Sequence, residues 1–129
     1  MNATGLRGLI LFAHGARDAR WAAPFESVAA LVRRERPALQ LRLAFLELMS
    51  PTLADAAAEL CAAGCRHIGV LPMFLGTGGH LRRDLPPMVE RLRADHPEVR
   101  WTLHAAVGEI DTVMQAMAAA AVSLSDGGA

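Results

Sequence analysis

The chain has 129 residues, of which 53% are hydrophobic and 20% are charged, and its thirteen basic and thirteen acidic side chains cancel. This length fits one domain that buries its own core, so neither a disulfide framework nor a structural metal is needed for folding. The balanced charge argues against a nucleic-acid-binding protein, whose affinity would come from a basic face. The high apolar fraction leaves surface for a partner, and we therefore expect an oligomer.

The cysteines and the N-terminal segment predict a cytoplasmic protein that does not contact a membrane. Cys61 and Cys65 are too few for a secreted disulfide scaffold and lack the second pair of a zinc site. We interpret them as buried thiols, with a Cys-x-x-x-Cys metal site as the alternative. No charged leader precedes a long apolar stretch, and Leu9–Ala13 is too short to cross a bilayer.

Short apolar segments alternate with helical segments along the chain. Residues 6–13 are an apolar run that ends at His-Gly, which predicts a strand that is buried on both faces. Apolar residues recur at helical spacing over residues 21–36 until Pro37, which predicts an amphipathic helix. Residues 39–46 return to a short apolar run and predict a second strand.

A second helix and a third strand follow. Ser50 suits the N-cap of this helix, Pro51 suits its first position, and Gly64 suits its end. Residues 67–75 predict a strand with a bend near Pro72, because proline lacks the N–H that a central strand uses.

The rest of the chain repeats the alternation. Asp84 suits the N-cap of a third helix that runs to about Asp95, residues 100–106 predict a fourth strand, and residues 110–124 predict a fourth helix before a frayed tail. This order predicts an α/β fold in which four parallel strands are joined by right-handed crossovers, with helices on both faces of the sheet. Ligands of such sheets bind outside the carboxyl ends of the strands.

Three side chains with metal-ligand chemistry follow three of these strands. His14 follows the first strand, Glu47 follows the second, and His80 lies in the loop after the third. Because the carboxyl ends of parallel strands meet at one edge, we expect these side chains to lie close together. Two imidazoles and a carboxylate suit Co²⁺, Ni²⁺, Fe²⁺ or Zn²⁺ and leave positions open for a substrate, which favours a working metal over a structural one.

Each ligand candidate also has a structural interpretation when it is taken alone. A histidine after a strand can cap backbone groups, and a loop glutamate can be solvated. We interpret His67, His96 and His104 as structural, because they flank strands or end a helix. Residues 76–79 are rich in glycine and could cradle a phosphate, but the chain has no lysine and no Gly-x-x-x-x-Gly-Lys-Ser/Thr motif.

Arginines accompany both of the ligand histidines. Every basic residue of the chain is arginine, which genome composition explains most simply, although guanidinium groups pair with carboxylates in a planar geometry that ammonium lacks. Arg17 and Arg20 follow the first histidine, and Arg82 and Arg83 follow the second. They are either a solvated charged surface or anchors for an acidic ligand.

Three segments carry a family resemblance: LILFAHGARD, FLELMSPTL and VLPMFLGTGGHLRRDLP. Over roughly residues 8–121, the chain resembles the class II chelatases, specifically the short, single-lobe sirohydrochlorin cobaltochelatases of the CbiX type. The His-Gly segment and the Gly-Gly-His-x-Arg-x-Asp segment are specific as a pair. Many members have serine after His-Gly, where this chain has Ala16.

The resemblance implies one chelatase-like lobe over residues 1–129 and a lyase that inserts Co²⁺, or else Ni²⁺ or Fe²⁺, into sirohydrochlorin without ATP or another nucleotide. Such enzymes act in cobalamin or related tetrapyrrole biosynthesis. The resemblance makes His14 and His80 the metal and catalytic residues, with Glu47 as their acidic partner. Metal insertion removes two pyrrole protons, and a neutral histidine accepts a proton near pH 7.

The resemblance also implies contacts to the carboxylate-rich rim of sirohydrochlorin by four arginines and two glycines. These residues are Arg17, Arg20, Gly78, Gly79, Arg82 and Arg83. Larger chelatases enclose the tetrapyrrole between two lobes, so a single lobe implies a homodimer with the cleft between its subunits. The alternatives are a non-catalytic carrier of metal or tetrapyrrole that uses the same residues, and a flavodoxin-like phosphate-binding module.

Overall fold

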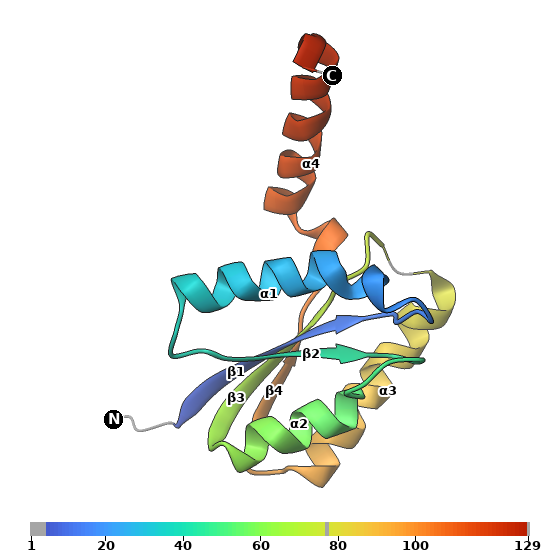
Figure 1. Cartoon of the computed structure of the whole chain (residues 1–129). Helices are drawn as coiled ribbons and strands as arrows, with labels where there is room; N and C mark the ends of the chain where they lie inside the picture. The colour runs from blue at the N-terminus through green and yellow to red at the C-terminus, as the bar shows by residue number, and fades with distance from the viewer. Residues whose placement is uncertain (1–4, 77, 129) are drawn as a thin grey trace.

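The computed structural model describes residues 5–76 and 78–128, which form one parallel sheet with flanking helices (Figure 1). The strands are β1 (Leu6–Ala13), β2 (Gln40–Phe45), β3 (Cys65–Pro72) and β4 (Arg100–Leu103). The longer helices are α1 (Ala23–Glu35), α2 (Leu53–Ala62), α3 (Gly79–Asp95) and α4 (Asp111–Ser123). Single helical turns are η1 (Ala19–Ala22), η2 (Val107–Glu109) and η3 (Leu124–Gly128).

The strand order β2-β1-β3-β4 determines where a ligand can bind. All three strand pairs are parallel, and β1 pairs with both β2 and β3. The chain therefore leaves β1 in one direction to reach β2 and returns past it to reach β3. Parallel sheets open a ligand crevice at such a switch point, outside the carboxyl ends of the strands. The predicted α/β fold with four parallel strands is confirmed.

The central strand β1 is buried on both faces, as its continuous apolar run predicts. Phe12 packs in one cluster with Leu60 of α2 and Val89 of α3, whereas Leu11 packs on the opposite face with Ala29 of α1. Among the described residues, no polar or charged side chain is fully buried. The polar chemistry of this part of the chain therefore lies at the edges of the sheet.

The start of α2 differs from the prediction of Ser50 as N-cap and Pro51 as first helical residue, which was wrong. The side chain of Thr52 caps the helix by accepting a hydrogen bond from the Asp55 amide at 3.1 Å. The reason lies in the preceding backbone: the Pro51 carbonyl accepts a hydrogen bond from the Phe45 amide at 2.9 Å. This bond ties Pro51 to the end of β2, so the helix begins only after Thr52.

The start of α3 also differs from the prediction, and Asp84 as N-cap was wrong. The helix begins at Gly79 with Gly78 as N-cap, and it includes Pro86 and Pro87. The Arg82 amide donates a hydrogen bond to the Gly78 carbonyl at 3.0 Å, so the first helical turn forms ahead of Asp84. The predicted end at Asp95 is confirmed.

Three strands are shorter than the sequence predicts. β2 spans Gln40–Phe45 instead of residues 39–46, β3 ends at Pro72, and β4 ends at Leu103. The predicted ranges 67–75 and 100–106 therefore extend into the loops at the carboxyl edge of the sheet.

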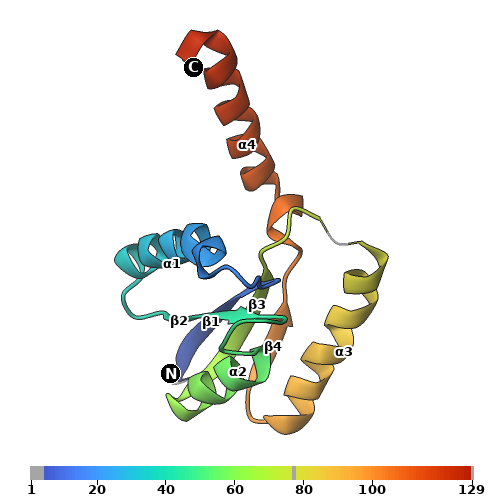
Figure 2. The same ribbon diagram turned by 45° about the vertical axis from the view of Figure 1, so that its right-hand side comes forward.

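The last helix lies on neither face of the sheet. Figures 1 and 2 both show α4 pointing away from the sheet, and none of its residues is buried. α1 covers one face over β1 and β2, while α2 and α3 cover the other face. Thr102 of β4 and His104 after it are consequently exposed on the face that α1 leaves open.

The C-terminal segment, predicted to be frayed, continues α4 as the turn η3, with non-helical backbone angles at Asp126 and Gly127. Residue 129 lies outside the described residues. No helix in the described part of the chain combines the length and the apolar character that a membrane crossing requires.

Candidate functional site

Two of the three predicted ligands meet at the carboxyl edge of the sheet. His14 directly follows β1 and Glu47 follows β2, and the Nε2 atom of His14 lies 3.3 Å from the Oε2 atom of Glu47. About half of each side chain is exposed, 49% for the histidine and 56% for the glutamate. The pair is therefore open to an ion or a large ligand that approaches from solvent.

The backbone around the pair leaves room only for glycine after the histidine. Gly15 has φ +100°, and a Cβ atom at this position would lie 1.9 Å from the Glu47 carbonyl oxygen. The Glu47 amide donates a hydrogen bond to the His14 carbonyl at 3.1 Å. The backbones of the loops after β1 and β2 are thus in direct contact and hydrogen-bonded. This contact sets the separation of the His14 and Glu47 side chains.

An aromatic side chain that the sequence analysis did not single out borders the site. The ring of Phe74 lies edge-on to the His14 imidazole, with 6.3 Å between the ring centroids. The same ring also packs edge-on against Phe12 of the core, with 6.5 Å between the ring centroids. In the sequence Phe74 is one of many apolar residues around β3, and only the switch-point topology places it beside the histidine.

The structure does not bring His80 to the His14–Glu47 pair. His80 is an exposed residue in the first turn of α3. Within residues 5–76 and 78–128, one group of three metal-ligand side chains has its ligand atoms within 4.8 Å of one another. That group lies elsewhere in the fold and does not include His80. Gly78 and Gly79 are exposed at the start of α3, and residue 77 lies outside the described residues.

The two arginines after β1 have different surroundings. Arg20 donates hydrogen bonds to both carboxylate oxygens of Asp18, the shortest of them 2.8 Å. These bonds lower the pKa of the Asp18 carboxyl. Arg17 is exposed and makes no hydrogen bond or ion pair within the described part of the chain. Arg17 is therefore the freer of the two to meet a ligand.

The two arginines of α3 also differ. Arg82 lies 3.6 Å from the Glu109 carboxylate of η2, an ion pair that links the start of α3 to the segment after β4. Arg83 donates a hydrogen bond from Nε to the Gly79 carbonyl within its own helix. All four predicted arginines are exposed.

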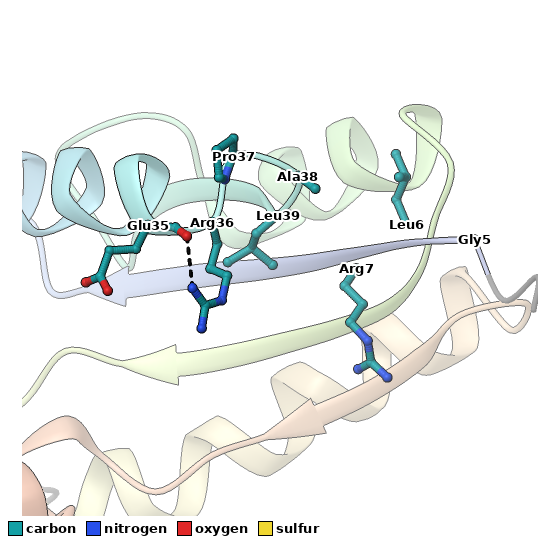
Figure 3. Close-up of a pocket in the computed structure, with 8 residues that line it drawn as sticks. All are labelled: Gly5, Leu6, Arg7, Glu35, Arg36, Pro37, Ala38 and Leu39. Carbon is teal, nitrogen blue, oxygen red and sulfur yellow. Dashed lines mark hydrogen bonds between the residues drawn. The ribbon is translucent and has the colours of Figure 1, made fainter.

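A hollow of the described surface lies away from this edge. It has a volume of about 640 Å³ and is formed by the start of β1 and the turn after α1, with Leu6, Arg7 and Leu39 among its lining residues (Figure 3). This is the amino edge of the sheet, opposite His14. The hollow has no part in the candidate site.

The two cysteines are free thiols: Cys65 is buried, as predicted, whereas Cys61 is only half-buried. Burial raises the pKa of both thiols.

The fold is a parallel α/β sheet whose switch point carries an exposed histidine–carboxylate pair. These features define a class of α/β protein with an open ligand site of metal-binding chemistry at the carboxyl edge of its sheet. Comparison with known proteins then places the chain: it belongs to the CbiX family, whose sequence model matches residues 8–123. The resemblance noted in the sequence is thereby confirmed.

Relatives and solved structures agree with this placement. A sirohydrochlorin cobaltochelatase of Saccharolobus solfataricus is 32% identical over 94 residues, covering 73% of this chain and 71% of the relative. A sirohydrochlorin ferrochelatase of Bacillus subtilis is 31% identical over 75 residues, covering 58% of this chain and 29% of the relative. A cobaltochelatase of Saccharolobus islandicus matches over 62% of its length, so the chain spans less than two thirds of some relatives.

A crystal structure of a CbiX protein from Marinobacter aquaeolei shares 32% identity with this chain and has a TM-score of 0.82, covering 93% of this chain and 98% of that one. The Bacillus subtilis subspecies spizizenii sirohydrochlorin chelatase SirB, solved with cobalt, shares the fold at 23% identity, with a TM-score of 0.72 and coverage of 82% of this chain and 45% of that one.

Proposed function

We propose that the chain is a sirohydrochlorin chelatase, a lyase that inserts a divalent metal ion into the macrocycle in cobalamin or a related tetrapyrrole pathway. The observation that carries this proposal is the pair of His14 and Glu47 at the switch point, with 3.3 Å between nitrogen and oxygen. Membership of the CbiX family and the chelatase names of the relatives support it.

The chemistry of insertion matches what this pair can do. Two pyrrole N–H protons leave for each divalent ion that enters, so an ion-binding group and a proton acceptor must be neighbours. The imidazole of His14 can bind the incoming ion or accept a proton, and the carboxylate of Glu47 orients the ring. This reaction releases protons without cleaving a nucleotide, and we propose that none is used.

The open edge suits a broad, flat substrate better than a small one. Both side chains of the pair are half exposed, and Phe74 adds an apolar surface beside the imidazole. A macrocycle can lie across such a surface with its centre over the pair. Free thiols at Cys61 and Cys65 fit a reducing compartment, and we propose that the protein acts in the cytoplasm.

We propose that His80 acts on the same macrocycle from a different point. Its ring nitrogens do not lie within 4.8 Å of the ligand atoms of both His14 and Glu47. In this arrangement His80 is therefore not placed to share one ion with both of them. Its position in the first turn of α3 is exposed and follows β3 at the same carboxyl edge. We assign it the role of second imidazole, as ligand or base.

The arginines supply the complementary charge for an acidic rim. Arg17 has no carboxylate partner within the described residues, whereas Arg20 is held by Asp18 and Arg82 by Glu109. We propose that Arg17 and Arg83 bind rim carboxylates directly, with Arg20 and Arg82 joining them, and that Gly78 and Gly79 give the rim close access. The arginine rim and the imidazole centre together select a carboxylated tetrapyrrole.

Cobalt is the metal that we propose. Imidazole and carboxylate ligands suit Co²⁺, Ni²⁺ and Fe²⁺ alike. The Saccharolobus relatives, which cover the larger part of this chain, are named cobaltochelatases.

We also propose that a second copy of the chain covers α4. Met114, Met117 and Val122 are 43–59% exposed, and no residue of α4 is buried. A lone helix of 13 residues is marginal in water and gains its stability from packing, so α4 needs a partner surface.

The open part of the α1 face of the sheet is the surface that we assign to this helix. A hollow of about 250 Å³ lies there, lined by Gly69, Thr102 and His104 among other residues. α4 contains one acidic residue, Asp111, and no basic residue, whereas Arg7 also lines the hollow. Reciprocal exchange of α4 about a two-fold axis would cover both helices and both open faces.

The experiment for the proposed activity incubates the purified protein with sirohydrochlorin and Co²⁺ without oxygen and follows the macrocycle absorbance. We expect insertion well above the spontaneous rate. Glu47→Gln should lower kcat/KM roughly 10- to 100-fold and His14→Ala roughly 100-fold or more. Glu35→Gln, an exposed acid at the far end of α1, is the matched control and should leave the rate unchanged.

Two outcomes would count against this proposal. A rate equal to the spontaneous reaction, with binding of Co²⁺ or of the tetrapyrrole retained, would make the chain a carrier. A rate that is unchanged in both His14→Ala and Glu47→Gln would place the active site elsewhere. Repeating the assay with Ni²⁺ and Fe²⁺ tests the choice of metal.

A further inference from the structure

A second group of metal-ligand side chains lies at the opposite edge of the sheet. Cys61 is in the last turn of α2, His96 is the C-cap of α3, and Glu98 lies in the turn before β4. One ligand atom from each lies within 4.8 Å of the others, and no other three such residues in the described ranges come this close. Figure 1 shows the ends of α2 and α3 at the amino ends of β3 and β4, away from the carboxyl end of β1.

The turn that carries two of these ligands is fixed by its own contacts. The His96 amide donates a hydrogen bond to the Leu92 carbonyl at 2.9 Å, and its carbonyl accepts one from the Val99 amide at 3.1 Å. The imidazole ring lies against Trp101 with 6.1 Å between ring centroids. The position of the imidazole is therefore largely set before any ligand arrives.

The separations are close to those that a metal ion requires. The Nδ1 atom of His96 lies 3.9 Å from the Oε1 atom of Glu98. Ligand atoms around a tetrahedral ion are about 3.4 Å apart when bond lengths are near 2.1 Å. Small side-chain rotations would therefore close the cluster. The carboxylate is exposed while Cys61 and the imidazole are half-buried, so an ion can enter from solvent.

We propose that Cys61, His96 and Glu98 form a second metal site, which binds one divalent ion of the zinc and cobalt type with water in the fourth position. Sulfur, nitrogen and oxygen ligands together suit borderline ions and disfavour Mg²⁺ or Ca²⁺. The site joins α2 to the turn between α3 and β4, so a bound ion also stabilises the fold. It does not depend on the chelatase proposal.

Binding at this site exchanges one proton for the ion. Burial, with a further contribution from Glu98, raises the pKa of the Cys61 thiol. The S–H proton leaves to solvent as the sulfur–metal bond forms. No redox change is involved.

The sulfur ligand gives this site a spectroscopic signature that the site of His14 and Glu47, the first site, lacks. We propose titrating the His14→Ala, His80→Ala double variant with Co²⁺ under a phosphine reductant and without oxygen, because this variant loses the imidazoles of the first site. We expect one equivalent per chain with a thiolate-to-cobalt charge-transfer band in the near ultraviolet. Adding Cys61→Ser should abolish the band, and His96→Gln or Glu98→Gln should weaken binding roughly tenfold or more.

The second thiol provides the matched control. Cys65→Ala removes a buried cysteine four positions along the chain and should leave the band in place. As an independent readout, Zn²⁺ should raise the melting temperature of the double variant and of its Cys65→Ala form but not of its Cys61→Ser form. Absence of the band, or a band and a thermal shift that survive Cys61→Ser, would overturn the proposal. Neither result bears on the chelatase rate of the unmodified chain.

Discussion

At the scale of single residues, the separation of His14 and Glu47 depends on a residue that has no side chain. Gly15 combines φ +100° with the close approach of the Glu47 carbonyl, so its position satisfies two constraints at once. Gly64 shares the same φ but has no atom within 4 Å of a hypothetical Cβ. Substitution of Gly64 therefore tests the cost of backbone strain alone, whereas substitution of Gly15 tests backbone strain together with a steric clash.

We predict that Gly64→Ala lowers the free energy of unfolding by about 1–2 kcal/mol, the cost of a left-handed backbone for alanine. Gly15→Ala should cost more, because the added methyl group also pushes the Glu47 carbonyl away. Chemical denaturation measures both effects. Only the Gly15 variant should lose chelatase activity under conditions where both variants are folded, and equal activity of the two would show that the locked loops do not position the pair.

A second prediction at this scale concerns the arginines after His14. Arg17 makes no hydrogen bond or ion pair within the described part of the chain, whereas Asp18 holds Arg20. Arg17→Ala should raise KM for sirohydrochlorin roughly twofold to fivefold with little change in kcat, as expected for one exposed ionic contact. Arg20→Ala should raise it less, and Arg34→Ala, on α1, should leave it unchanged. The ranking would be wrong if Arg20→Ala had the larger effect.

The sequence allowed part of this site to be predicted. His14 and Glu47 could be placed together because each follows a strand of a parallel sheet, and strand ends share an edge. The contact of Phe74 with the imidazole and the pairing of Asp18 with Arg20 depend on how the loops fold over one another. No periodicity in the sequence records such contacts. His80 is at the predicted edge, but its distance from the pair depends on where α3 begins.

At the scale of elements, the type and order of the helices and strands were predictable, while several boundaries were not. Hydrophobic period identifies a buried strand or an amphipathic helix over many residues, but a helix start depends on a few local hydrogen bonds. Ser50 and Thr52 are both chemically suited to cap α2. The hydrogen bond from the Phe45 amide to the Pro51 carbonyl selects Thr52.

This selection gives a prediction about stability. Thr52→Ala removes the acceptor of the Asp55 amide and should lower the free energy of unfolding by about 1 kcal/mol. Ser50→Ala, the matched change at the position that the sequence suggests, should stay within about 0.5 kcal/mol of the unmodified chain. Thermal or denaturant unfolding of both variants measures the difference. A larger loss of unfolding free energy for Ser50→Ala than for Thr52→Ala would show that Ser50 is the N-cap, as the sequence indicates.

At the scale of the whole molecule, the four-stranded parallel sheet followed from the alternation of strand and helix, but the position of α4 did not. The sequence of α4 is that of an ordinary packed helix, with large apolar residues at helical spacing. Helical periodicity shows that a helix needs an apolar partner without showing whether that partner is in the same chain. The sheet order leaves an open face beside α1, which gives such a helix a surface to cover.

Charge placed on α4 tests whether that surface belongs to a second copy. Met117→Asp puts a carboxylate among the large apolar side chains and should convert a dimer to a monomer at micromolar concentration in sedimentation equilibrium, because burying an unpaired charge is costly. Ala119→Asp adds the same charge about half a helical turn away and should leave the dimer intact. A monomeric unmodified chain whose α4 amides are protected from hydrogen exchange would show instead that α4 packs on its own sheet.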